Sequence, residues 1–149
     1  MTEKAAQGIG GRKILHATSV AVSGRGLLIT GSSGAGKSAL ALQLIALGAL
    51  LISDDQTELT VTTAGLMARC PSPAIEGLIE ARGIGLLRAP SAETAVLALV
   101  VDMGQDETER LPPCRSVTIL GQALPLVLRA RHDHFPAALM VYLQGGRQH

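Results

Sequence analysis

An eight-residue glycine-rich segment, residues 31–38 with the sequence GSSGAGKS, constrains the fold of this chain more than any other feature. It matches the phosphate-binding pattern G-x-x-x-x-G-K-[ST] at every fixed position. The apolar residues 26–30 before it are typical of a buried strand, and the leucine-rich residues 39–47 after it predict a helix. A strand, a glycine loop and a helix in this order predict a nucleotide-binding loop rather than an ordinary turn before a helix.

The residue types of this segment suit phosphate chemistry. Glycines let backbone N–H groups close around phosphate oxygens, and the helix N-terminus adds a partial positive charge. Lys37 is expected to reach the outer phosphates, and the Ser38 hydroxyl is expected to hold a magnesium ion. The predicted nucleotide-binding residues are Gly31, Ser32, Ser33, Gly34, Ala35, Gly36, Lys37 and Ser38.

Two adjacent carboxylates follow the next predicted strand. The apolar residues 49–53 end in Asp54 and Asp55. A strand, a helix and a second strand at this spacing predict a crossover unit with parallel strands, which places the acidic pair at the same sheet edge as the glycine loop. There one carboxylate could serve the metal and the other could take a proton, although such a pair also suits a turn or a helix N-cap. Asp102, after the apolar residues 95–101, competes with the pair for the metal side.

The rest of the chain predicts mainly strands. Residues 1–12 are expected to form a flexible lead-in and residues 13–149 a single domain. Further strands are expected at residues 14–22, which include His16, and at 57–62, 116–120 and 124–128, with a hairpin turn at 23–26 and a last helix at 135–143. Pro125 favours an edge position for its strand, residues 103–113 predict a polar loop, and alternate glycines in residues 80–87 predict a bulge or a close backbone approach.

Composition excludes several classes of partner. The net charge is +1, from 13 basic and 12 acidic residues with no basic run, so we expect neither nucleic acid nor a membrane surface as partner. The absence of Trp, with one Tyr and one Phe, predicts an aliphatic core and no platform for stacking bases. Cys70 and Cys114 are isolated, which indicates free thiols, and no signal peptide or apolar span is present, so a cytoplasmic location is expected.

With these residues identified, the sequence resembles the C-terminal catalytic domain of HPr kinase/phosphorylase. The resemblance rests on His16, the glycine loop, Asp54–Asp55 and residues 80–87 (EARGIGLL), which look like the signature segment of the family, and it covers roughly residues 13–120. It implies an α/β fold, a phosphate-loop nucleotide-binding domain similar to phosphoenolpyruvate carboxykinase, with a mixed sheet and few helices. It also implies a serine kinase that acts on the phosphocarrier protein HPr of the phosphotransferase system.

The same resemblance implies residue roles and partners. Asp55 would be the general base, His16 and Lys37 would line the reacting phosphates, and Ser38 with Glu80 would ligate magnesium. Arg110 would correspond to the catalytic arginine of the family. ATP and Mg²⁺ would be the cofactors, HPr or an HPr-like protein the acceptor, and a homo-hexamer the expected assembly.

The sequence departs from the family pattern in three places. No N-terminal domain precedes the match, so the chain looks like a short form of the family. No counterpart of the dephosphorylation loop is found near residues 119–123, so we expect phosphorylase activity to be weak or absent. Residues 129–134 replace a recognisable family ending, in the part of the chain where the family's C-terminal helix helps to dock the partner protein. Two alternatives stay open: a phosphotransferase for small molecules, similar to a carboxykinase, and a nucleotide-sensing module that transfers nothing.

Overall fold

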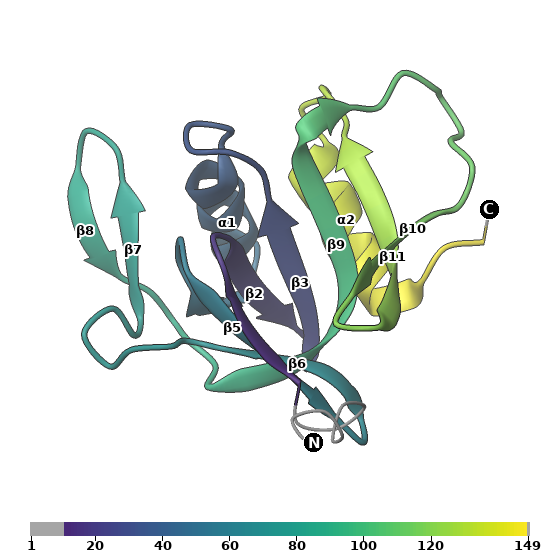
Figure 1. The fold of residues 1–149 in the computed structure, drawn as a ribbon. Helices are drawn as coiled ribbons and strands as arrows, with labels where there is room; N and C mark the ends of the chain where they lie inside the picture. The colour runs from purple at the N-terminus through teal and green to yellow at the C-terminus, as the bar shows by residue number, and fades with distance from the viewer. Residues whose placement is uncertain (1–10, 149) are drawn as a thin grey trace.

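The computed structural model describes residues 11–148, in which two helices pack against one large mixed sheet (Figure 1). The strand order of the sheet is β1-β5-β6-β9-β3-β2-β4; β11 also pairs with β9, and β10 pairs with β11. Two further strands, β7 and β8, form a separate hairpin. The elements are β1 (Arg12–Leu15), β2 (Thr18–Val22), β3 (Arg25–Thr30), α1 (Lys37–Ala46), β4 (Leu50–Ser53), β5 (Thr57–Thr62), β6 (Gly65–Arg69), β7 (Leu78–Ala81), β8 (Gly85–Arg88), β9 (Thr94–Asp106), β10 (Arg115–Ile119), β11 (Gln122–Arg129) and α2 (Phe135–Gly145). The predicted α/β class with a mixed sheet and few helices is therefore confirmed.

Strand directions bring the phosphate loop and the acidic pair to one edge of the sheet. β2 is antiparallel to both β3 and β4, so β3 and β4 run in the same direction, as the sequence predicted. They are not neighbours, because β2 lies between them. The carboxyl ends of β3 and β4 nevertheless lie on one side, and this is where open α/β sheets bind ligands.

Two aliphatic clusters cover the faces of the central strands. One cluster packs α1 and α2 against β2, β3 and β9, and the other fills the space between these strands and β5, β6 and β11. In α1, Leu40 and Leu44 are buried, whereas Leu47, beyond the last helical residue, is 51% exposed. Gly48, at φ 112°, follows the helix and turns the chain toward β4.

The N-terminal strand prediction was wrong in one respect. Residues 14–22 form two strands, because the chain breaks at His16 and Ala17 so that β1 pairs with β5 while β2 pairs with β3. His16 therefore lies in a link and not in a strand. The predicted turn between β2 and β3 is confirmed, with positive φ at Ser23 and Gly24 as a tight hairpin requires. Of the predicted lead-in, residues 1–10 lie outside the described residues, and Arg12 already belongs to β1.

Three predictions for the second half also need correction. Pro125 does not mark an edge strand, because β11 lies between β9 and β10; the pairing with β9 starts only at Leu126, where a backbone N–H is again available. Residues 103–106 continue β9 instead of starting a loop. The glycines of residues 80–87 form neither a bulge nor a close approach: Gly83, at φ 89°, lies in the turn of the β7–β8 hairpin, and Gly85, at φ 142°, is the first residue of β8. This hairpin projects from the sheet in Figure 1.

Neither helix of the described residues is long and apolar enough to cross a lipid bilayer.

Candidate active site

The phosphate loop joins β3 to α1, and its conformation depends on glycine. Gly31, Gly34 and Gly36 have φ angles of 141°, 85° and 97°, a region that side chains with a Cβ rarely adopt. At Gly31 a Cβ would also lie 3.0 Å from the Cβ of Ala35. The glycines thus permit a turn whose backbone can approach an anion closely, ahead of the N-terminus of α1.

Lys37 brings a positive charge into this loop. The side chain is buried, and its Nζ donates hydrogen bonds to the carbonyl oxygens of Gly31 at 2.8 Å and Ser32 at 3.1 Å. These carbonyls orient the ammonium group within the loop. An ammonium held beside backbone N–H groups is the arrangement that binds the outer phosphates of a nucleotide.

Asp54 connects the loop helix to three other parts of the site. Its Oδ1 accepts hydrogen bonds from Ser38 Oγ at 2.6 Å and from Thr18 Oγ1 at 3.0 Å. Its Oδ2 accepts a hydrogen bond from the backbone N–H of Glu80 at 3.1 Å. The carboxylate is buried, and a buried charge needs such partners. Asp54 therefore holds the start of α1, the end of β4, strand β2 and the β7–β8 hairpin in fixed positions.

Asp55 points elsewhere. Its φ of 71° is left-handed, which is unusual for a residue other than glycine, and its backbone N–H donates to Thr18 Oγ1 at 3.1 Å. Its side chain is 61% exposed, and Oδ1 lies 3.1 Å from Nε2 of His16. The same nitrogen of His16 lies 3.5 Å from the Ser33 hydroxyl of the loop. The two adjacent acids thus have different environments, one buried and bonded and the other exposed beside an imidazole.

These groups line one cavity of about 420 Å³. Its lining combines loop residues, the acidic pair and the first residues of the hairpin: Ser33, Gly34, Gly36, Lys37, Ser38, Ala39, Asp54, Asp55, Glu80 and Arg82. Of the predicted site residues, Lys37, Ser38, Asp55 and Glu80 meet here, and His16 joins them through Asp55. Gly31, Ser32 and Ala35 shape the loop without lining the cavity.

Two predicted residues do not meet at this cavity. Arg110 lies in the exposed segment between β9 and β10, which arcs away from β3 and α1 in Figure 1. Asp102 is on β9 next to β3, but its carboxylate accepts hydrogen bonds from Gly104 N at 2.8 Å and Gln105 Nε2 at 2.9 Å. The Asp102 carboxylate thus bonds only to groups of its own strand β9 among the described residues, whereas the Asp54 carboxylate lies beside Ser38.

Thr18 is the residue that the sequence analysis missed. It is fully buried and bonds both acids, by donating to Asp54 and accepting from Asp55. A threonine in an apolar strand is most often only a strand former, so its residue type carried no signal of this role.

The donor set of the cavity suits magnesium. Ser38 offers a hydroxyl and Asp54 and Glu80 offer carboxylates, all hard oxygen donors of the kind that Mg²⁺ takes. Among residues 11–148 no group of three or more His, Cys, Asp or Glu side chains is placed to hold a metal. The few protein oxygens present fit a cation that keeps waters and takes phosphate oxygens as its other ligands.

Comparisons with known proteins agree with this geometry. The family model described as HPr Serine kinase C-terminal domain matches residues 7–95, which include the loop, the acidic pair and Glu80 but not Asp102 or Arg110. The chain is 44% identical over 110 residues to the HPr kinase/phosphorylase of Bordetella pertussis, and the aligned region covers 66% of this chain and 35% of that relative. It is 41% identical over 114 residues to the HPr kinase/phosphorylase of Acidovorax sp. (strain JS42), and here the aligned region covers 68% of this chain and 36% of the relative.

The chain therefore spans about a third of the length of these curated relatives. A solved structure of the Hpr(Ser) kinase/phosphatase from Coxiella burnetii matches with a TM-score of 0.73 and 27% identity, over 89% of this chain and 94% of that one. Family match and fold agree, and on this basis the chain belongs to the HPr serine kinase C-terminal domain family.

Proposed function

We propose that this protein is a kinase that transfers the terminal phosphoryl group of ATP, with Mg²⁺, to a serine of HPr or an HPr-like phosphocarrier. The family membership and the phosphate-loop cavity support a phosphotransferase. The names of the relatives support HPr as the acceptor. We include in the proposal a cytoplasmic location, a homo-hexameric assembly and weak or absent phosphorylase activity.

The loop and Lys37 bind and orient the nucleotide. Backbone N–H groups of residues 33–38 and the N-terminus of α1 take the phosphate oxygens, and Lys37 turns from the loop carbonyls toward the outer phosphates. Ser38, Asp54 and Glu80 would hold the magnesium ion, which would neutralise charge on the phosphates. Arg82, which lines the same cavity, adds positive charge at the rim.

Asp55 takes the proton of the acceptor. A seryl hydroxyl is a poor nucleophile until a positioned base accepts its proton. As Asp55 takes that proton, the seryl oxygen bonds to the terminal phosphorus and the bond from phosphorus to the bridging oxygen breaks, so that ADP leaves. His16, 3.1 Å from Asp55, orients the carboxylate toward the phosphate loop.

One observation carries this proposal: the two adjacent acids are divided by environment. Asp54 makes three hydrogen bonds and is buried, whereas Asp55 is 61% exposed at the cavity. A nucleotide-binding module without transfer would have no use for an exposed carboxylate held at a strained φ of 71°. Arg110 remains a proposed participant, which would require its segment to approach the cavity.

The test compares Asp55→Asn with Asp133→Asn, the same change at an exposed position before α2 and outside the cavity. Labelled phosphate transfer from ATP to purified HPr is measured, together with ATP affinity by calorimetry. Loss of a general base lowers the rate by about 10²–10⁴-fold. We expect such a loss for Asp55→Asn with ATP affinity retained, and wild-type transfer for Asp133→Asn.

The same assay distinguishes the alternatives. Transfer at the wild-type rate by Asp55→Asn would refute the base assignment. Phosphate that appears on a metabolite in the absence of HPr would favour the small-molecule phosphotransferase. ATP-dependent binding of HPr with no transfer by the wild-type protein would favour the nucleotide-sensing module.

A further inference from the structure

A second cavity lies at the far end of β3 from the phosphate loop. Its volume is about 430 Å³, and it shares no lining residue with the first cavity. Arg25, the first residue of β3, lines it, whereas the phosphate loop begins at Gly31. A strand rises about 3.3 Å per residue, so roughly 20 Å separates the two sites. A nucleotide phosphate in the loop would therefore leave this cavity open.

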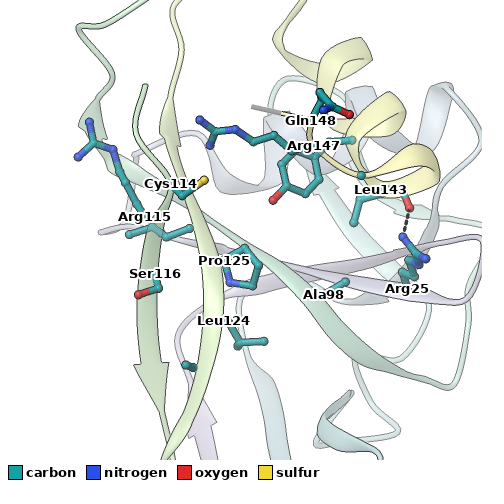
Figure 2. Close-up of a pocket in the computed structure, with 14 residues that line it drawn as sticks. Arg25, Ala98, Cys114, Arg115, Ser116, Leu124, Pro125, Leu143, Arg147 and Gln148 are labelled. Atoms are coloured by element: carbon teal, nitrogen blue, oxygen red, sulfur yellow. Dashed lines mark hydrogen bonds between the residues drawn. The ribbon is translucent and has the colours of Figure 1, made fainter. Parts of the chain in front are cut away.

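Three segments that are distant in sequence build the walls. They are the end of α2 with the residues that follow it, the paired strands β10 and β11, and the neighbouring strands β3 and β9, which contribute Arg25 and Ala98. Gly146, at φ 79°, turns the chain after α2, so that Arg147 reaches back toward Cys114 on the strand side, as Figure 2 shows. The cavity thus has a strand wall and a helix wall with an arginine across its opening.

The lining is positively charged. It contains Arg25, Arg115 and Arg147 and no acidic residue. The positive charge of Arg115 is balanced by Glu107, because the guanidinium donates two hydrogen bonds, of 3.1 and 3.0 Å, to the Glu107 carboxylate.

Arg25 and Arg147 bond to backbone carbonyl groups instead of carboxylates. Arg25 donates to the carbonyl oxygen of Leu143 at 3.1 Å near the end of α2, and Arg147 donates to the carbonyl oxygen of Pro112. Both acceptors are neutral, and within residues 11–148 neither guanidinium forms an ion pair with a carboxylate. A guanidinium has five N–H donors, so each retains donors for a ligand.

The rest of the lining is largely apolar. Ala98 on β9, Leu124 and Pro125 on β11 and Leu143 on α2 give it a hydrocarbon floor, with Ser116 on the exposed side of β10 (Figure 2). Apolar surface and uncompensated positive charge in one cavity suit a ligand that has both characters.

We propose that this cavity binds a small amphipathic anion, with an apolar body on the β9–β11 floor and one carboxylate or phosphate headgroup drawn by Arg25 and Arg147. The inference concerns a second site and does not depend on the transfer chemistry of the first.

Calorimetric titration of the whole protein tests this with four probes that share an eight-carbon chain. Octanoate and octyl phosphate carry the two anionic headgroups, 1-octanol is neutral, and octylammonium is cationic. A charge-assisted hydrogen bond is about twice as strong as a neutral one, so we expect at least one anion to bind about tenfold or more tightly than octanol, and octylammonium most weakly. The anion that binds more tightly shows whether the cavity prefers a carboxylate or a phosphate headgroup.

Matched variants place the binding in this cavity. Ser116→Phe puts an aromatic ring into it from the exposed strand β10, while Thr118→Phe makes a similar change two residues along and outside the lining. Arg147→Gln removes a lining charge, and Arg88→Gln removes an exposed charge on β8. We expect the first member of each pair to weaken the anion about tenfold and its control to bind as the wild type, with ATP affinity unchanged in all four as evidence of intact folding.

Three results would overturn the proposal. The first is equal affinity of the wild-type protein for octanol and both anions. The second is wild-type affinity for the anion in Ser116→Phe or Arg147→Gln. The third is a wild-type oligomer, seen by sedimentation, that dissociates on Ser116→Phe, because this face would then be an interface between copies of the chain.

Discussion

Replacing Thr18 with valine tests whether one buried hydroxyl holds both acids in place. The two side chains have nearly the same shape, so the change removes hydrogen bonds without opening a cavity. Two bonds are lost: the one donated to Asp54 Oδ1 at 3.0 Å and the one accepted from Asp55 N at 3.1 Å. Each is worth about 0.5–1.5 kcal/mol, so Thr18→Val should destabilise the fold by about 2 kcal/mol.

That loss has a thermal and a kinetic consequence. For a chain of 149 residues, about 2 kcal/mol lowers the Tm by about 4–8 °C. The Thr18 hydroxyl is the acceptor for the backbone N–H of Asp55, so its loss lets the Asp55 backbone relax from φ 71° and displaces the carboxylate from its position beside His16. A tenfold lower kcat corresponds to about 1.4 kcal/mol, and we expect at least this loss. KM for ATP should change less than kcat, because Asp54 keeps its hydrogen bonds to Ser38 and Glu80.

Thr62→Val is the matched control. The Thr62 hydroxyl also donates one bond, to Gly65 O at 2.9 Å, and accepts one, from Ala64 N at 3.2 Å, but in the β5–β6 turn. Calorimetric unfolding and phosphate transfer to HPr are measured on both variants. We expect the control to keep the wild-type kcat, and a kcat in Thr18→Val no lower than in Thr62→Val would show that this hydroxyl does not position the acids.

Three further predictions concern the loop, the core and the surface. Gly31→Ala should weaken ATP binding about tenfold in calorimetry, because a side chain at φ 141° is strained; wild-type affinity would mean that the loop tolerates a Cβ. Leu44→Ala should destabilise the fold by about 3 kcal/mol and Leu47→Ala, 51% exposed, by less than about 1 kcal/mol; equal losses in denaturant unfolding would contradict the packing of α1. Arg115 holds the pKa of Glu107 below its ordinary value of 4.5, so the charged form stabilises the fold above that pH and this contribution is lost as pH falls through the lowered pKa. The wild-type Tm should therefore fall more on acidification from about pH 7 to pH 3 than that of Glu107→Gln, and parallel Tm profiles would refute the ion pair.

Contiguous features could be predicted from the sequence because their physics is local. The loop at residues 31–38 lies in one stretch, its glycines supply the backbone angles, and the apolar runs on either side specify a strand and a helix. The position of Asp54 and Asp55 at the same edge also followed, since a crossover connection dictates strand direction. The roles of His16, Glu80 and Arg110 came from the family resemblance and not from their spacing.

Features that join distant segments were decided only by the tertiary structure. Thr18 bonds to residues 36 and 37 positions away, and nothing in an apolar strand indicates which hydroxyl will face a carboxylate. Pro125 was predicted at an edge from its missing N–H, but the register lets β11 begin pairing with β9 one residue later.

The second cavity needs Arg25 and Arg147, which are more than a hundred residues apart, on either side of the end of α2. Hydrophobic periodicity encodes which face of a strand or helix is buried, and the loop motif encodes its own shape. Neither encodes which strands become neighbours, and that choice, made by packing the whole aliphatic core at once, put a buried acid and an exposed acid beside one phosphate loop.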